Sequence, residues 1–361
     1  MKEGKGVKKL SIALLVAAAA VGLMVSGAAG KGAKTTATGT QVCVLLPDTT
    51  SSPRWQQFDK PAFINAFKKA GLTAAVVNAL NQPQKQLAQA EQCINNGAKV
   101  GIITSLDTGT SIAIQKKFTA AGGKTIDYDR QIVGGTGSVY ISFDGNAVGR
   151  IQARGVIAGM KAKKTYSAKG VVAELWGGPT DANAFWFKSG NDDILNPLFK
   201  GKKLTKGPQK FVPDWDSKNA QTIFEQMLVQ TNNNIQGVVA ANDNIAGAVV
   251  ATLKAKGLKP IALTGQDATV QGVQNIISGW QTNTVYKYVP DEANAAAAAA
   301  VALFKGKAPK TNATRPNGSK KQPTLVIPVV SITKANYTRL FTDKFLKRSD
   351  VCSGEYKQYC K

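Results

Sequence analysis

The feature that most constrains the fold is a regular alternation of short apolar runs with longer segments of helical length. The first block predicts strands at 42–46, 74–77, 100–103 and 125–128, and helices at 55–70, 82–96 and 110–121. Gly71, Gly97 and Gly122 follow the three helical segments, which is typical of helix ends that need a positive φ. Strand, helix and strand at this spacing predict βαβ units and a parallel sheet.

A glycine-rich break at 134–137 separates this block from a second one. There the sequence predicts strands at 139–143, 171–175, near 211, 238–241, 261–264, 284–286 and 325–329. The helices predicted between them cover 148–162, 185–198, 220–230, 245–255, 270–277 and 291–304. We therefore expect an α/β protein with two Rossmann-like lobes, each a parallel sheet flanked by helices. The expected lobes comprise residues 41–141 with 270–308, and 142–269 with 309–340, before a C-terminal tail at 341–361.

The N-terminus has the order of a secretory signal peptide. Basic residues within 2–9 precede an uncharged apolar run at 10–25, and small residues follow at 26–30. We expect a signal peptide at 1–29, a flexible leader at 30–40, and export to the periplasm or another extracytoplasmic space. A retained membrane anchor is the less favoured alternative, because the apolar run is short for a span.

The chain has no histidine and four cysteines. Without histidine, Ser-His-Asp and Cys-His catalysis are removed and most zinc sites are improbable, so we expect no cofactor. An even number of cysteines outside the cytoplasm suggests disulfides. Pairing of Cys352 with Cys360 closes a short loop and leaves Cys43 with Cys93, although the sequence leaves the other two pairings open.

The charge is strongly positive, with 46 Lys and Arg against 22 Asp and Glu. Such a balance raises the question of nucleic-acid binding. However, the lysines are scattered, and their densest runs at 161–164, 202–203 and 320–321 fall in predicted loops or at helix ends. A solvated basic surface is the favoured interpretation, and no nucleic-acid partner is expected.

Polar side chains gather where the predicted strands end. They are Asp48, Arg54, Asp129, Arg130, Asn242, Asp243, Gln266, Asp267 and Lys287. Loops at the carboxyl ends of parallel strands carry ligand groups in sheets of this kind. We therefore expect a small polar ligand in a cleft between the two lobes.

A sugar matches these residue types. Carboxylates accept hydroxyl protons, arginine donates a planar fork of hydrogen bonds, asparagine does both, and aromatic rings cover the C–H faces. The candidate ligand-binding residues are Arg54, Trp55, Asp129, Arg130, Asn183, Trp215, Asn242, Asp267 and Lys287. Taken singly, each has a structural alternative, since Asn242 could only cap a helix and Trp55 could belong to the core. Their joint placement on the same kind of loop favours binding.

Several motifs occur in a set order along the chain. They are Arg54-Trp55, Tyr128-Asp129-Arg130, Ser142-Phe143-Asp144, Ala241-Asn242-Asp243, Gly265-Gln266-Asp267 and Tyr286-Lys287. In this combination the chain resembles the D-xylose-binding branch of the type I periplasmic binding proteins of ABC transporters, from about residue 41 to about residue 330. The loop at 49–53, the Cys43 and Cys93 pair and the C-terminal tail depart from that pattern.

The resemblance implies two lobes joined by three strands, with a cleft that closes on its ligand. Arg54, Asp129 and Arg130 would bind the sugar from the first lobe, Asn183, Asn242 and Asp267 from the second, and Lys287 from near the hinge. Trp55 and Trp215 would sandwich the sugar ring.

We therefore expect a monomeric, non-enzymatic binding protein that carries a neutral monosaccharide, D-xylose first, to an ABC permease in the membrane. One alternative is presentation of the sugar to a chemoreceptor or sensor kinase. A LacI-type regulator is less favoured, because an export signal stands where such proteins carry a helix-turn-helix. A glycosidase using Asp129 and Asp267 is also less favoured, because a nearby cation makes a carboxylate a poor general acid.

Overall fold

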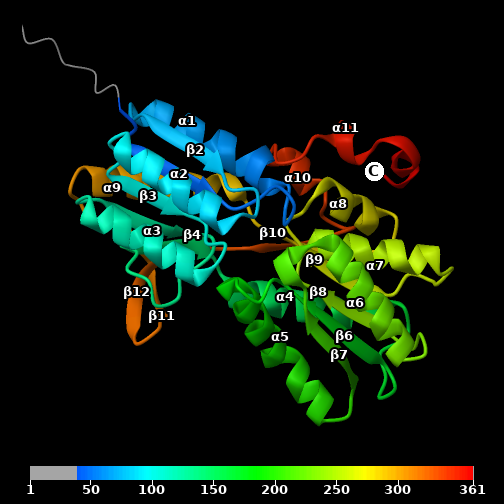
Figure 1. The fold of residues 1–361 in the computed structure, drawn as a ribbon. Helices are drawn as coiled ribbons and strands as arrows, with labels where there is room; N and C mark the ends of the chain where they lie inside the picture. Colours follow the sequence, from blue (N-terminus) through cyan, green and yellow to red (C-terminus); the bar gives the residue numbers. More distant parts are fainter. Residues whose placement is uncertain (1–38, 361) are drawn as a thin grey trace, which may run out of the picture. The chain divides into compact units, whose positions relative to one another are not determined.

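The computed structural model describes residues 39–360. The expected signal peptide at 1–29 lies outside the described residues, as does the expected leader except for residues 39 and 40. Within the described part, the alternation of strands and helices follows the predicted order (Figure 1). No helix among residues 39–360 is long and apolar enough to span a bilayer.

The first lobe is built on a seven-stranded sheet with parallel neighbours except at one edge hairpin. Its order is β11 (Ala313–Asn317), β12 (Lys320–Ile327), β5 (Val139–Phe143), β4 (Lys124–Tyr128), β3 (Val100–Ile103), β1 (Val42–Leu46) and β2 (Ala74–Asn78). The helices of this lobe are α1 (Lys60–Ala70), α2 (Pro83–Asn95), α3 (Thr108–Ala120) and α9 (Val289–Phe304), and a π-helical turn η1 (Trp55–Asp59) precedes α1.

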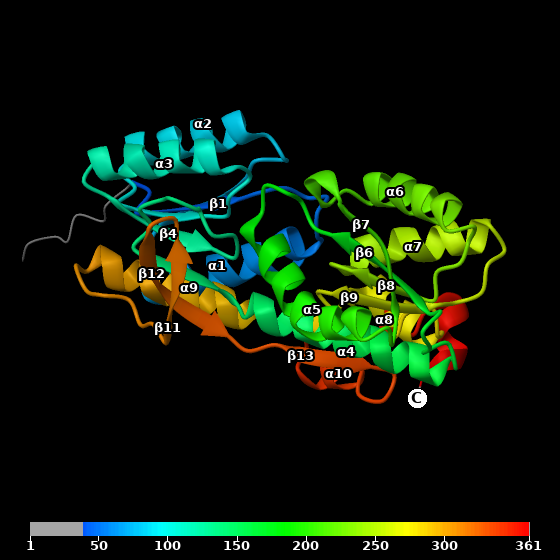
Figure 2. The ribbon, with the colours of Figure 1, turned by 90° about the horizontal axis from the view of Figure 1, so that it is seen from below.

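Strand β1 shows why this sheet is covered on both faces. Val42, Val44 and Leu46 share an apolar cluster with α1 and α9, whereas Cys43 and Leu45 share another with α2 and α3. Successive side chains of a strand point to opposite faces, so an unbroken apolar run requires helices on both. Figure 2 shows α2 and α3 on one side of the sheet and α1 and α9 on the other.

The second lobe repeats this arrangement on a six-stranded sheet. Its order is β13 (Val330–Thr333), β10 (Asn283–Tyr286), β9 (Ala262–Gln266), β8 (Gly237–Ala240), β6 (Val171–Trp176) and β7 (Thr205–Phe211). Only β13 runs antiparallel to its neighbour. The helices are α4 (Gly145–Ala162), α5 (Ala182–Lys200), α6 (Ser217–Gln230), α7 (Asp243–Ala255) and α8 (Val270–Ile277), with a short 3₁₀ turn η2 (Pro213–Trp215) after β7.

The chain passes between the two sheets three times, after β5, β10 and β12. The expected fold class is therefore confirmed: two α/β lobes with mostly parallel sheets and flanking helices. The expected division of the chain between the lobes, however, differs from the strand composition of the two sheets. Strand β10 belongs to the second sheet instead of the first, and β11 and β12 belong to the first instead of the second.

The pairing of β12 with β5 explains this difference. Leu325 lies opposite Ile141, and Leu325 and Ile327 pack against the first-lobe core. An apolar alternation predicts a strand but not which of two neighbouring sheets it joins. The hairpin partner β11 was not predicted because its sequence, ATRPN, has no apolar run, and the edge strand β13 directly follows the predicted strand 325–329.

Both expected disulfides are present. Cys43 of β1 is bonded to Cys93 of α2, and Cys352 is bonded to Cys360. The second bond lies in the C-terminal tail, which forms α10 (Arg339–Thr342), α11 (Arg348–Val351) and the 3₁₀ turn η3 (Gly354–Tyr359).

Removal of the first disulfide is expected to cost more stability than removal of the second. Their sequence separations are 50 and 8 residues, which correspond to about 4 and about 2.5 kcal/mol of lost loop-closure entropy in the unfolded chain. Urea denaturation of a Cys43→Ala/Cys93→Ala variant, beside Cys352→Ala/Cys360→Ala, measures the two losses. An equal or reversed order would contradict the expectation.

Three buried carboxyl groups outside the interlobe cleft hold a proton more tightly than free carboxyls do. Burial raises the pKa of Asp127, Glu174 and Asp243 to about 7 in each case, from ordinary values of 3.8 or 4.5. Asp127 accepts hydrogen bonds from Gln115, Gln322 and the Ile132 amide, which lower its pKa but do not outweigh burial.

Because these groups bind protons more tightly when folded, the protein is expected to be more stable at pH 5.5 than at pH 8. Their stabilising contribution is complete below the ordinary carboxyl pKa and is lost as the pH rises through about 7. Urea denaturation at the two pH values measures the free energy of unfolding. An Asp127→Asn variant should show a smaller difference, and a wild-type stability that rises towards pH 8 would disprove the assignment.

Candidate functional site

A small cavity lies where the loops of the two lobes meet. It is lined by Ser51, Ser52, Arg54, Trp55, Asp129, Arg130, Asp181, Asn183, Phe187, Trp215, Asn242, Gln266, Asp267 and Lys287. All nine residues selected from the sequence are therefore brought together around one cavity. Asp48 and Asp243, which also follow strands, do not line it.

Arg54 and Asp129 form the first-lobe centre of the site. The Arg54 Nη1 donates to Asp129 Oδ2 at 2.7 Å, and its Nε and Nη2 donate to Asp59 at 3.0 and 2.8 Å. Nη2 also donates to Glu292 of α9. Burial alone would raise the pKa of Asp129, but the charges of Arg54, Lys287 and Arg130 outweigh it and hold that pKa below its ordinary value.

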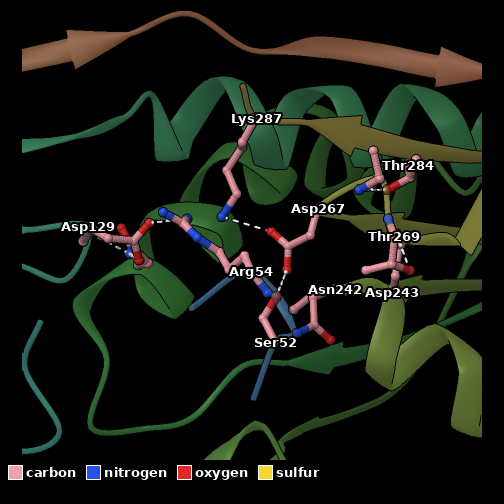
Figure 3. A network of polar contacts seen from close by, with 12 residues as sticks. Ser52, Arg54, Asp129, Asn242, Asp243, Asp267, Thr269, Thr284 and Lys287 are labelled. Carbon is pink, nitrogen blue, oxygen red and sulfur yellow. Dashed lines mark hydrogen bonds and ion pairs between the residues drawn. The ribbon is translucent and has the colours of Figure 1, made fainter. Parts of the chain in front are cut away.

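Asp267 and Lys287 form the corresponding pair in the second lobe. Lys287 Nζ lies 2.9 Å from Asp267 Oδ1, and the Ser52 hydroxyl donates to Asp267 Oδ2 at 3.0 Å. Figure 3 shows Lys287 reaching Asp267 on one side of Arg54, while Arg54 points to Asp129 on the other. Asp129 and Asp267 are thus each held by a cation, Arg54 and Lys287 respectively.

The two aspartates have the same local backbone. Asp129 follows β4 and Asp267 follows β9, with φ of 59° and 94°. The amide of Asp129 donates to Ile141 of β5, and the amide of Asp267 donates to Val285 of β10. A positive φ is uncommon for a residue other than glycine, although aspartate adopts it more readily than most. Both aspartates leave their strands in this conformation and line the cavity.

Helix α5 of the second lobe contributes its first residues to the site. Asp181 caps the helix by accepting from the Asn183 amide, and its carboxylate lies 3.1 Å from Arg130 Nε. Asn183 Nδ2 donates to the carbonyl of Asp129 at 2.8 Å. Arg130 is therefore ion-paired with Asp181, whereas Arg54 is the direct partner of Asp129.

The aromatic walls are placed by close packing. The Arg54 guanidinium lies 4.4 Å from the centre of the Trp55 ring, and Phe187 packs edge-on to Trp215 at 6.3 Å. The Trp215 ring lies against Gly177, where an added Cβ would come within 2.1 Å of it. Any larger residue at 177 would displace the ring, so the glycine creates the space that Trp215 fills.

Direct hydrogen bonds join the two lobes around the cavity. Besides Ser52 to Asp267 and Asn183 to Asp129, the Asn242 side chain donates to the carbonyl of Ser51 at 3.0 Å. Asn242 also caps α7 by accepting from the Ile245 amide, so one side chain both caps a helix and lines the cavity. The lobes are in a closed arrangement, in which the cavity residues bond to one another.

The sequence did not indicate four of the lining residues: Ser51, Ser52, Asp181 and Phe187. Gln266 was noted among the polar residues at strand ends but was not selected as a ligand-binding residue. The unusual loop at 49–53 was the only signal for the two serines. Asp48 organises that loop, because it accepts from the amides of Thr50 and Ser51 and from the Ser51 hydroxyl. Among residues 39–360 no group of three or more potential ligands is placed to hold a metal ion.

Known proteins with this architecture bind sugars. Residues 43–308 match the family model of the periplasmic binding protein domain. The D-xylose-binding periplasmic protein of Escherichia coli (strain K12) is 33% identical over 300 residues, which cover 82% of this chain and 88% of that protein. The multiple sugar-binding periplasmic receptor ChvE of Rhizobium radiobacter is 29% identical over 362 residues, covering 94% and 99%.

Solved structures agree with these relatives. A carbohydrate transporter solute-binding protein of Chloroflexus aurantiacus, in complex with D-glucose, is 29% identical with a TM-score of 0.77, covering 86% of this chain and 98% of that one. An ABC transporter solute-binding protein of Clostridium phytofermentans with bound β-D-glucose has a TM-score of 0.80 at 25% identity, covering 86% and 100%. The chain therefore belongs to the type I periplasmic sugar-binding proteins.

Proposed function

We propose that this protein is the solute-binding component of an ABC sugar importer and that it binds a neutral monosaccharide, D-xylose or a related aldose, in the interlobe cavity. The observation that carries the proposal is the pair of cation-held carboxylates, Asp129 and Asp267, contributed by opposite lobes to one cavity. A ligand that bonds to both carboxylates stabilises the closed arrangement of the lobes.

The charge of the cavity favours a neutral ligand. Three cations and three carboxylates line it: Arg54, Arg130, Lys287, Asp129, Asp181 and Asp267. Their charges balance, so the cavity offers many hydrogen-bond partners without a net charge that would select an ionised ligand. Such dense, fixed donors and acceptors can compete with water for the hydroxyl groups of a sugar.

The aromatic walls of the cavity favour a cyclic sugar. Trp55 and Trp215 line it, and their flat faces can cover the C–H groups of a sugar ring. The relatives named for D-xylose and the neighbours solved with glucose support an aldose.

Delivery to a membrane permease by an exported protein is inferred from the periplasmic and transporter-associated relatives. A second role is supported by the relative described as a multiple sugar-binding receptor. We infer from it that the closed protein could instead present its sugar to a chemoreceptor or sensor kinase, using the same cavity. Pull-down by the liganded protein of a permease or of a sensor distinguishes the two roles.

Catalysis and nucleic-acid binding receive less support. A glycosidase needs one carboxylic acid with a raised pKa, whereas of the pair considered from the sequence, Asp129 has a lowered pKa and Asp267 is paired with Lys287. Burial does raise the pKa of a third cavity carboxyl, Asp181, to about 6, but this group is held by Arg130 at 3.1 Å. The lysines of the densest sequence runs lie at the ends of helices α4 and α5 and in the β11–β12 hairpin, without a common element.

Isothermal titration calorimetry with a panel of neutral monosaccharides tests the proposed function. D-xylose or a related aldose should bind with micromolar or tighter affinity. Asp267→Ala should weaken binding on the order of 100-fold or more, because it removes an acceptor and leaves Lys287 without its partner. Absence of heat with every sugar of the panel would refute the proposal.

Asp193→Asn provides a matched control, because Asp193 is a half-exposed carboxylate of α5 that pairs with Arg150 outside the cavity. Its affinity should equal that of the wild type. Thermal denaturation without sugar should show that both variants are folded.

A further inference from the structure

The C-terminal tail shares an apolar cluster with the segments that carry cavity residues. From the tail, residues 337–360, the cluster includes Tyr337, Leu340, Phe345, Leu346 and Val351. From the rest of the chain, it includes Phe58, Ala268, Val273, Ile277, Tyr286, Tyr288, Val289 and Ile332. We refer to this set as the tail cluster. Figure 1 shows α10 and α11 close to α8.

Cluster residues and cavity residues are neighbours in the sequence. Ala268 follows Asp267, and Tyr286 and Tyr288 flank Lys287. Lys287 directly follows strand β10, so the side chains of Tyr286 and Tyr288 point to the side opposite Lys287. The tail cluster therefore packs behind the short segments that also carry cavity residues.

The first lobe is tied to the cluster through η1. Phe58 lies three residues after Trp55, and its ring stacks on that of Phe345 with centroids 4.3 Å apart and 15° between the planes. Phe345 also contacts Tyr286 at 4.9 Å and Tyr288 at 6.3 Å. One tail side chain thus touches both the turn that begins with Trp55 and the connection that carries Lys287.

Hydrogen bonds anchor the tail on the second lobe. The Gln274 side chain of α8 donates to the carbonyls of Asp350 and Val351, at 3.2 and 3.3 Å. The Cys352–Cys360 disulfide closes the end of the tail, and both cysteines pack against the cluster. Phe345 is therefore a buried ring on an anchored segment rather than a loosely attached end.

We propose that the C-terminal tail is a positioning element of the sugar site, in which Phe345 holds the segments 54–58 and 286–288 so that Arg54, Trp55 and Lys287 face the cavity. The proposal rests on the proposed function for the identity of the ligand. The positioning itself is a property of the unliganded protein. The ring partners of Phe345 are Phe58, Tyr286 and Tyr288, which do not line the cavity, so Phe345 is a positioning residue that acts through them.

Hydrogen–deuterium exchange of the unliganded full chain, followed by titration with D-xylose, tests this proposal. In Phe345→Ala, amide exchange at 54–58 and 286–288 should rise several-fold. D-xylose affinity should fall on the order of five-fold, mainly through faster dissociation. Phe345→Leu keeps most of the apolar bulk and should restore most of the amide protection at 54–58 and 286–288 and most of the D-xylose affinity.

Phe341→Ala is the matched control, because it removes a ring of the same tail whose ring contacts, Tyr337 and Arg348, lie within the tail. Its exchange should change only in the tail, and its affinity should stay within about two-fold of the wild type. If Phe345→Ala does not fold, Phe58→Ala tests the same contact from the first lobe and should raise exchange around Phe345.

The proposal is overturned if Phe345→Ala raises exchange only at 337–351, or if Phe341→Ala loosens 54–58 and 286–288 equally. If the wild type binds no D-xylose, the failure concerns the proposed ligand, and exchange at 54–58 and 286–288 still decides whether the tail positions the site.

Discussion

The site depends on one buried guanidinium that three carboxyl groups surround. Arg54 is bonded to Asp59, Asp129 and Glu292, and all four side chains are almost completely buried. Burial raises the pKa of Glu292 well above its ordinary value and also raises that of Asp59, although the charge of Arg54 opposes both shifts. Isolated charges at this depth would be very costly, so the groups are stable only as a hydrogen-bonded set.

This set connects three parts of the first lobe. Asp59 ends η1, Asp129 follows β4 and Glu292 belongs to the first turn of α9, directly after the second connection between the lobes. The Tyr128 hydroxyl also donates a hydrogen bond to Asp59 and so joins this hydrogen-bonded set. A planar arginine fork fixed in this way can present Asp129 and its own Nη1 to a ligand without losing entropy on binding.

The second lobe then needs only short contacts to close on this centre. Ser52, Asn183 and Asn242 bridge the lobes, while Asp267 offers its carboxylate from the opposite side. Under the proposed function, a sugar that enters the cavity replaces some bonds between protein groups by bonds to its own hydroxyls. Closure and ligand selection then use the same side chains, and the proposed role of the tail cluster is to support them.

Much of this arrangement is visible in the sequence, because local patterns control it. Apolar runs predicted β1, β3 and β5 with their observed bounds, and strand ends identified Asp129 and Asp267. Glycines at 71, 97 and 122 have the predicted positive φ. Two of the three carboxyl partners of Arg54, Asp59 and Glu292, could not be predicted, because they lie in helical segments where charged residues are ordinarily solvated.

The other features that the sequence did not predict share a physical cause, because each depends on contact between segments that are distant in the chain. The bond of Ser52 to Asp267 spans 215 residues, and the membership of β12 in the first sheet depends on its pairing with β5. The place of Trp215 is set by the missing side chain of Gly177, and that of Phe345 by Phe58. No local periodicity encodes such contacts.

A crystal structure of the protein grown with saturating D-xylose would show whether the two lobes bind one sugar between them. We expect one sugar in the interlobe cavity, with its hydroxyls bonded to Asp129 and Asp267 and its ring between Trp55 and Trp215. A sugar bound outside this cavity, or one that contacts the residues of a single lobe only, would contradict this expectation.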